Sequence, residues 1–256
     1  MGMDTDSDGV VMGHGWGVVH LMLRVRRGGN AEVIREAITR FSAIEPNQAI
    51  TFSVLGGRAD IGVMLIAPDL DALDRCTKQI LGAPVRCVAS FFSVTELSEY
   101  TTTEADERAR LATEGAEDVA GALAVWRDRM AKYHHDRLYP RLPNRRVIAF
   151  YPMSKTRLVG ANWYQLDFAE RKRLMLGHGR VGRKYAGRVV QLITGGTGLD
   201  NWEWGVTLLA DDPTVIKDIV YEMRFDEVSA VYGEFGPFWT GLVMDLGDTL
   251  SRSGLS

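Results

Sequence analysis

The sequence predicts an α+β fold made of tandem ferredoxin-like repeats, units with the element order β-α-β-β-α-β. The first observation is an internal repeat, because residues 52–69 resemble residues 190–212. In both copies an apolar, β-branched run ends in Gly-Gly and an alternating run follows, which indicates two antiparallel strands joined by a turn. The second observation is that helical spacing of apolar residues follows each copy. The third is that a strand and then a helix precede each copy.

The first unit starts with a strand over residues 17–25, and Asn30 is the expected N-cap of the helix that follows. A final strand over residues 86–94 closes the unit. The two helices show apolar faces at helical spacing, formed by Val33, Ile34, Ala37, Ile38 and Phe41 in one and by Leu70, Leu73, Thr77 and Ile80 in the other. Each face is expected to pack on a sheet.

The second unit starts with a strand over residues 146–151, which Pro152 is expected to end. Asp167 and Glu170 have the spacing of a capping box at the start of the next helix. After the repeated hairpin, the last helix has the apolar face Val215, Ile216, Ile219, Val220 and Met223. A strand over residues 229–233 is expected to close the unit.

These elements divide the chain into segments. We expect a flexible N-terminus over residues 1–11, an N-terminal half over 12–100 that acts as scaffold, and a C-terminal half over 146–247 that holds the ligand. Two antiparallel sheets that each need one face covered would pack together or close into a barrel, with helices outside. The intervening residues 101–145 divide into an acidic, solvated linker and a connecting helix, and residues 248–256 are expected to be a frayed tail.

The composition is that of a globular protein, with 46% hydrophobic and 25% charged residues. The formal net charge of -3 excludes a strongly basic field for nucleic acid or anionic lipid, so any anion site must be local. The two cysteines lie apart from each other and from any histidine pair, so they provide neither a disulfide framework nor a metal-binding cluster. With no secretory signal and no apolar run of about 18 residues, we expect a cytoplasmic protein.

Four of the five histidines have settings that favour structural or solvated roles. His14 lies in a glycine-rich stretch and His20 in a predicted strand, so structural roles are expected. His134 and His135 follow one another on a helix, where neighbouring residues face different ways, and an exposed pair is expected.

His178 lies on the helical face that should meet the sheet, together with Leu174, Val181 and Tyr185. An imidazole there is either a hydrogen-bonded core residue or a ligand pointing into a cavity. The flanking Gly177 and Gly179 each cost about 1 kcal/mol in a helix, and close approach of a large flat ligand would explain them. The equivalent helix of the first unit has no histidine, so we expect function in the second half.

The segment from Phe150 to Lys155 is the other candidate. If pairing ends at Pro152, Tyr151 and Lys155 are presented at a strand edge or in a loop. A half-buried tyrosine and a solvated lysine are the structural alternative. Several arginines lie just upstream, and a surface role is the default for each. Any of them that faces inward could neutralise a ligand carboxylate. They are Arg137, Arg141, Arg145 and Arg146.

The second half resembles the coproheme decarboxylase branch of the chlorite dismutase-like family. The matching motifs, in chain order, are LYPRLPNRRVIAFYPMSK (138–155), NWY (162–164), HGRVGRKYAG (178–187), QLITG (191–195), EWGV (203–206) and EMRFDEVS (222–229). In the first half only VTELSEY (94–100) clearly matches, as expected for a scaffold.

The resemblance implies a dimeric α+β barrel subunit, usually five to a ring, with the porphyrin in the C-terminal half. It implies an oxidoreductase that uses hydrogen peroxide to decarboxylate two propionates of iron coproporphyrin III (coproheme), giving haem b through a three-propionate intermediate. This is the last step of coproporphyrin-dependent haem biosynthesis. Coproheme is then both substrate and redox cofactor, haem b is the product, and a transient contact with a coproporphyrin ferrochelatase is implied.

The resemblance also assigns residues. It implies that His178 is the proximal iron ligand, that Tyr151 forms the catalytic tyrosyl radical, and that Lys155 binds a propionate. It places Gln191 on the distal side of the iron and Met153 in the pocket lining. The residues it places around the propionates are Arg137, Arg224, Ser229 and Tyr100. A tyrosine with a pKa of about 10 keeps its proton at neutral pH and can lose it together with an electron.

Two alternatives stay open beside the decarboxylase. A chlorite-decomposing haem enzyme would be expected to carry a distal arginine where this sequence has Gln191, which disfavours that activity. A non-enzymatic haem-binding or haem-delivery protein on the same fold would bind haem b without removing propionates. Actinobacterial decarboxylases use a distal histidine before the tyrosine, so a proton-shuttling role for His134 also stays open.

Overall fold

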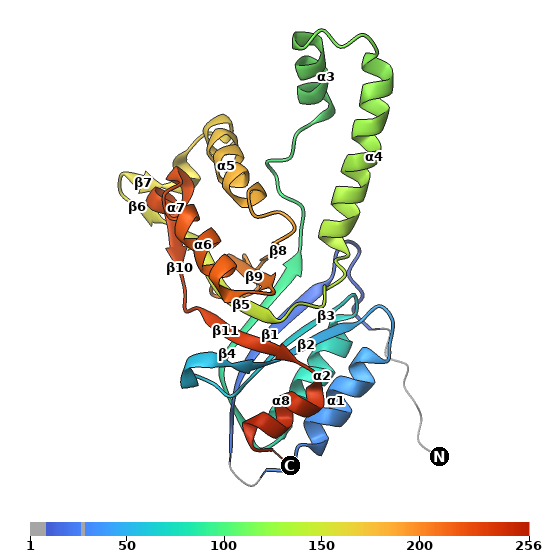
Figure 1. The fold of residues 1–256 in the computed structure, drawn as a ribbon, viewed down its shortest axis with the longest axis vertical. Helices are drawn as coiled ribbons and strands as arrows, with labels where there is room; N and C mark the ends of the chain where they lie inside the picture. Colours follow the sequence, from blue (N-terminus) through green and yellow to red (C-terminus); the bar gives the residue numbers. More distant parts are fainter. Residues whose placement is uncertain (1–8, 27–28, 256) are drawn as a thin grey trace.

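The computed structural model describes residues 9–26 and 29–255, whose main sheet closes into an antiparallel barrel (Figure 1). The strand order is β10-β5-β11-β2-β3-β1-β4-β8-β9, and pairing of β5 with β9 closes the ring. These strands are β1 (Gly17–Val25), β2 (Gln48–Val54), β3 (Ile61–Ala67), β4 (Val85–Thr95), β5 (Val147–Lys155), β8 (Val189–Gly195), β9 (Trp204–Ala210), β10 (Gly233–Phe235) and β11 (Trp239–Met244). A small hairpin of β6 (Arg157–Leu158) and β7 (Ala161–Asn162) follows β5.

Helices lie outside the barrel in three groups (Figure 1). The first group, against the N-terminal half, is α1 (Glu32–Ser42), α2 (Leu70–Gly82) and α8 (Leu246–Ser253). The second group, over the C-terminal half, is α5 (Phe168–Arg183), α6 (Pro213–Met223) and α7 (Glu227–Tyr232). The third is a hairpin of α3 (Glu104–Thr113) and α4 (Val119–Leu138), which projects away from the barrel.

The predicted fold class is confirmed. The N-terminal unit has the order β1-α1-β2-β3-α2-β4, and the C-terminal unit repeats it with β5, α5, β8, β9, α6 and a closing strand. The two units are joined at two seams, where β11 pairs with β2 and β4 pairs with β8. The barrel is therefore one body with residues from both halves in its wall.

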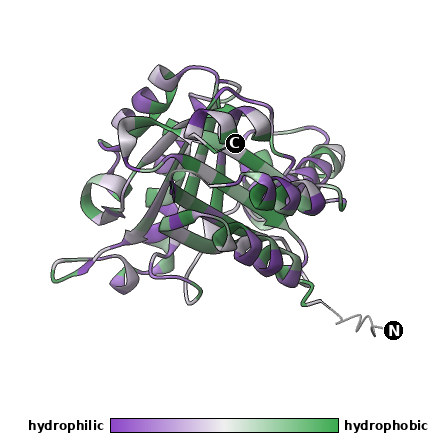
Figure 2. Ribbon diagram, turned by 90° about the horizontal axis from the view of Figure 1, so that it is seen from below, coloured by the Kyte–Doolittle hydropathy of each residue, from purple (hydrophilic) through white to green (hydrophobic). Residues whose placement is uncertain are grey.

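Large apolar side chains from both halves fill the barrel interior. Phe52 and Phe91 of the first half share one buried cluster with Phe150 and Trp239 of the second. Figure 2 shows the same segregation, with mainly hydrophobic strands in the centre and helices that carry a polar outer face. Burial of this area is the main stabilising contribution that the fold offers.

His20 is a core residue, as expected. Its ring stacks on Phe150 with centroids 3.9 Å apart, and its Nε2 lies 2.9 Å from Oγ1 of Thr207. Burial lowers the pKa of His20 to about 3, so the imidazole is neutral at physiological pH.

Two predicted strand ends in the second unit are wrong. Pairing does not stop at Pro152, because β5 continues to Lys155 and Pro152 lies opposite Gly205. Proline lacks only the N–H donor, and its carbonyl accepts a hydrogen bond from the Gly236 N–H at 2.8 Å. Residues 229–233 do not form the closing strand: they lie mostly in α7, and β11 closes the unit.

The expected linker and tail both contain helices. Thr103 and Asp106 form a capping box that opens α3, and Glu104 pairs with Arg127 to hold α3 against α4. At the chain end, Asp245 caps α8, whose Leu250 is fully buried in the N-terminal core. Apolar side chains at Leu250 and Leu255 explain why residues 248–255 pack instead of fraying.

Two predicted helix caps also differ. Ala31 is the N-cap of α1, although Oδ1 of Asn30 accepts the Glu32 N–H at 2.7 Å. Asp167 caps α5 by accepting the Glu170 N–H, while the Glu170 carboxylate bonds to Arg173. Of the expected flexible N-terminus, residues 1–8 lie outside the described residues, and the Leu70 N–H donates to the Val10 carbonyl.

Candidate functional site

The outer face of β5, β8 and β9 brings together the candidates that lie on strands. Tyr151 and Met153 of β5 stand opposite Val206 and Trp204 of β9. Gln191 of β8 stands opposite Leu208, two residues further along the same face of β9. Because alternate residues of a strand share a face, Tyr151, Met153, Lys155 and Gln191 all lie on the face that α5 and α6 cover.

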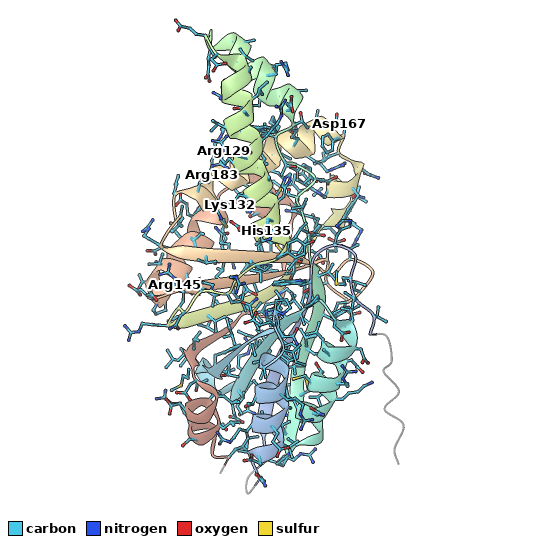
Figure 3. The ribbon with its side chains drawn as sticks, turned by 90° about the vertical axis from the view of Figure 1, so that its right-hand side faces the viewer. Arg129, Lys132, His135, Arg145, Asp167 and Arg183 are labelled. Carbon is cyan, nitrogen blue, oxygen red and sulfur yellow. The ribbon has the colours of Figure 1, made fainter. Side chains whose placement is uncertain are left out.

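Helix α5 crosses this face. Figure 3 shows Asp167, at the start of α5, on the opposite side of the view from Arg183 at its end. Near that end a Cβ at Gly182 would lie 3.3 Å from Nε2 of Gln191 and from Cε of Met223, so helix and strand approach closely there. A Cβ at Gly177 would meet nothing within 4 Å. Approach of a flat ligand, the expected reason for Gly177 and Gly179, stays a prediction.

His178 projects from the middle of α5 and is hydrogen-bonded. Its Nδ1 lies 3.0 Å from Oδ2 of Asp226, the N-cap of α7. The same carboxylate accepts bonds from the N–H and Oγ of Ser229. Burial raises the pKa of Asp226, but the bonds from His178 and Ser229 outweigh burial and lower it, so it is ionised at neutral pH. An Asp226 that accepts from Nδ1 leaves Nε2 free to coordinate a metal.

Lys155 is buried, contrary to the alternative of a solvated lysine. Only 6% of the residue is exposed, and its Nζ lies 4.8 Å from the centre of the Trp163 ring. Burial lowers the pKa of Lys155 to about 8, while the charges of Asp226 and Glu203 oppose this shift.

Tyr151 is also buried, with 5% exposed, between two aromatic rings. It stacks on Phe238 with centroids 4.2 Å apart and lies 6.0 Å from Phe235. Its hydroxyl makes no hydrogen bond within the described part of the chain. Burial raises the pKa of Tyr151 to about 12, an effect that the charge of Arg224 partly offsets. The phenol is therefore protonated throughout the physiological pH range.

The remaining predicted residues border this face from other elements. Arg224 follows α6 with its guanidinium 5.3 Å from the Phe235 ring centre, and Ser229 lies in α7 beside Asp226. The Tyr100 hydroxyl accepts a bond from Nε of Arg171 on α5. Arg137 of α4 donates to the Glu96 carbonyl at 3.4 Å. Arg145 instead pairs with Asp211 at 2.5 Å, away from these residues.

Two side chains on one face of α4 carry buried nitrogens without partners. Nε of Arg137 and Nε2 of His134 have no hydrogen-bond partner within the described residues. His135 points elsewhere and is exposed on α4 (Figure 3). The expected exposed histidine pair is thus wrong for His134. A buried, unpaired guanidinium nitrogen is the feature that an anionic ligand would satisfy.

Sequence reasoning missed three residues of this region. Asp226 could have been found as a helix cap, since it precedes Ser229 by three residues. Glu203 is a 6% exposed carboxylate that accepts the Lys155 N–H at 2.7 Å, and Trp163 packs against Lys155. Both lie in motifs quoted above, but neither residue type indicated its contact.

The donor set fits an iron porphyrin. Among the described residues, no three His, Cys, Asp or Glu side chains gather to hold a metal ion. A single imidazole whose second nitrogen is bonded to a carboxylate suits a metal that brings its other ligands with it.

The described residues also include no helix with the length and apolar character needed to span a bilayer.

Residues 30–244 match the family model described as Chlorite dismutase. The chain belongs to the chlorite dismutase family. A Haloquadratum walsbyi protein whose name describes it as heme-binding is 43% identical over 218 residues, which are 84% of this chain and 38% of that protein. A similarly named Natronomonas pharaonis protein is 43% identical over 77% of this chain and 31% of its own length. This chain thus spans well under half of either relative.

Solved structures of the family share the fold. A heme-binding protein from Thermus thermophilus is 33% identical with a TM-score of 0.77, and the match covers 94% of this chain and 96% of that one. A variant of the chlorite dismutase from Candidatus Nitrospira defluvii has a TM-score of 0.70 at 15% identity, covering 95% and 97%. The second likeness shows the fold alone. The expected relationship to the chlorite dismutase-like family is confirmed.

Proposed function

We propose that this protein is a hydrogen peroxide-dependent coproheme decarboxylase that converts iron coproporphyrin III to haem b. The observation that carries the proposal is one arrangement of residues. Tyr151 and Lys155 share a strand face with Gln191, and α5 crosses that face with His178 bonded to Asp226. The relatives named as heme-binding support binding of an iron porphyrin.

In this proposal the chain's residues hold a tetra-anionic substrate whose iron and ring supply the oxidising chemistry with peroxide. Nε2 of His178 holds the iron, and Gln191 lies on the distal side. Lys155, Arg137 and Arg224 bind propionates through charge-assisted hydrogen bonds, with Ser229 and Tyr100 beside them. Met153 lines the pocket.

Tyr151 is the proposed redox group. Its protonated phenol gives up an electron and a proton together, and the tyrosyl radical then takes a hydrogen atom from a C–H bond of the neighbouring propionate, which restores the phenol. Each propionate becomes a vinyl group as it releases carbon dioxide, one proton and two electrons. These two electrons and this proton, together with one further proton from solvent, reduce one hydrogen peroxide to two waters. Phe235 and Phe238 exclude water from the ring, which confines the radical.

The test is to load the purified protein with iron coproporphyrin III and titrate it with hydrogen peroxide. Chromatography with mass detection should show the three-propionate intermediate first and haem b later. His178→Ala should change the Soret spectrum, and added imidazole should restore it; His135→Ala, on the exposed side of α4, is the matched control. A His178→Ala spectrum identical to that of the parent would refute ligation.

The non-enzymatic alternative is a haem-binding protein, and the heme-binding names of the relatives favour it over a chlorite-decomposing enzyme. It predicts tight binding of haem b with no loss of propionates. Oxygen release from chlorite would support the third possibility, a chlorite-decomposing haem enzyme. The same loaded protein distinguishes all three. The proposed cytoplasmic location can be tested by cell fractionation, and the proposed pentamer can be tested by measuring the mass of the protein in solution.

A further inference from the structure

The chain places a buried ammonium at the end of β5. Lys155 is 6% exposed and lies against the indole of Trp163, while its strand pairs with Gly233 of β10. An ammonium taken out of water loses hydration that one aromatic ring does not replace, so it needs an anionic partner or becomes neutral.

The charges of two carboxylates act on Lys155, that of Asp226 more strongly than that of Glu203. Asp226 is already bonded to Nδ1 of His178 and to the N–H and Oγ of Ser229. These bonds hold Asp226 in place beside His178, so Glu203 is the carboxylate that acts on Lys155 from the strand side. Glu203 bonds to the Arg157 guanidinium and lies close to Tyr164, but its other oxygen is directed at residue 155.

Glu203 is also bonded to β5 at two neighbouring residues. Its Oε2 accepts the Lys155 N–H at 2.7 Å, and its own N–H donates to Oγ of Ser154 at 3.2 Å. Its carbonyl accepts the Gly196 N–H at 2.7 Å. These bonds fix the end of β5 to the loop between β8 and β9, and hence fix which way the Lys155 side chain leaves the strand.

We propose that Glu203 is a positioning residue for Lys155, which fixes the backbone at residue 155 and, together with Asp226, supplies negative charge that keeps the buried ammonium cationic towards a ligand carboxylate. The ligand part rests on the proposed function, in which Lys155 binds a propionate. The claim that Glu203 keeps Lys155 charged concerns the protein without a ligand. A neutral lysine in this place would offer a carboxylate no charge, so removal of the Glu203 charge narrows the pH range in which the anionic porphyrin is held.

The first experiment measures the charge of Lys155 without any porphyrin. Protein labelled with ¹³Cε-lysine is titrated by NMR, and the Lys155 signal is assigned as the one absent from Lys155→Met. The parent should titrate near the pKa of about 8 that its burial gives. Glu203→Gln should lower the midpoint by about one pH unit, since one unit is the size of a single close charge interaction at a partly solvated site.

Arg157→Gln is the matched control, because it removes the cation on the other side of the Glu203 carboxylate. It should leave the Lys155 midpoint unchanged or raise it, whereas loosening of the fold would move both variants the same way. Glu203→Asp, which keeps the charge, should restore most of the parent midpoint. A Glu203→Gln midpoint within about 0.3 units of the parent, with an unchanged melting temperature, would overturn the proposal.

The second experiment measures affinity for iron coproporphyrin III between pH 6 and 9. The pH above which affinity falls should lie about one unit lower in Glu203→Gln than in the parent, and the two should bind alike near pH 6. If the two proteins have identical pH profiles of affinity although the Lys155 midpoint is shifted, Lys155 does not bind the porphyrin. That result would contradict only the claim that Lys155 binds a propionate. Absence of haem b from the parent would contradict the decarboxylase and leave the lysine titration intact.

Discussion

Nδ1 of His178 lies 3.0 Å from Oδ2 of Asp226, a contact that joins the middle of α5 to the cap of α7. An imidazole bonded to a carboxylate is a stronger electron donor through its other nitrogen than one bonded to a neutral group. Asp226 therefore controls both the direction of the ring and its basicity.

Asp226→Asn should weaken binding of iron coproporphyrin III by about 10- to 100-fold, the usual cost of losing the partner of a metal-bound histidine. The reduction potential of the bound iron should rise, because a less basic imidazole stabilises ferric iron less. Equilibrium binding and spectroelectrochemistry measure the two effects. Asp167→Asn, which removes a carboxylate charge from the N-cap of α5 but keeps a capping oxygen, is the control and should leave the potential unchanged.

Tyr151→Phe should bind iron coproporphyrin III within about twofold of the parent and form no haem b, since the ring and its stacking on Phe238 are kept. Product analysis after peroxide addition checks this. Tyr185→Phe is the matched control, because Tyr185 is also a buried residue and its hydroxyl is bonded to Glu222, and this variant should still make haem b. Vinyl formation by Tyr151→Phe at the parent rate would remove Tyr151 from the chemistry.

His20 should make the protein sensitive to acid. Its folded pKa of about 3 lies below the unfolded value of 6.5, so the unfolded chain takes up the proton first as the pH falls. The stabilisation is complete above pH 6.5 and declines from there towards pH 3, by a total on the order of a few kcal/mol. Urea unfolding at pH 7, 5 and 4 should show a steeper decline for the parent than for His20→Gln. Parallel declines would contradict this assignment.

Leu250→Ala should lower the free energy of unfolding by about 2 to 5 kcal/mol, because Leu250 is fully buried between α8 and the N-terminal core. Denaturant unfolding measures the loss. The exposed Arg252→Ala in the same helix should change stability by less than about 0.5 kcal/mol. A frayed tail would instead give both substitutions equally small effects.

The sequence predicted the elements whose periodicity is strong. The repeat at 52–69 and 190–212 marks two hairpins that the structure contains. Of the expected apolar faces, Leu73 and Ile80 of α2 and Ile216 and Ile219 of α6 are buried. The sequence-based predictions were wrong where a tertiary contact overrode a local sequence rule. Pro152 stays in β5 because its carbonyl is paired, and Val228 lies in a helix because the Asp226 cap and burial against Trp163 favour one.

For the candidate site, the strand register explains what the sequence could only suggest. Tyr151, Met153 and Lys155 alternate along one strand, so a continuous β5 puts them on one face. The partners of the charged groups could not be predicted, since Asp226 and Glu203 lie 48 residues from His178 and Lys155 in the chain. Contacts between residues so far apart in the chain depend on how β9 and α7 pack against β5 and α5, and no local sequence pattern encodes that packing.

The place of β11 in the barrel also affects how the chain is made. This strand, formed by residues 239–244, separates β5 from β2, so the ring stays open on a ribosome until those residues have emerged. Until then β5, which carries Tyr151 and Lys155, has an unpaired edge. A nascent chain that ends before β11 therefore exposes an edge of β5 that could pair with another chain.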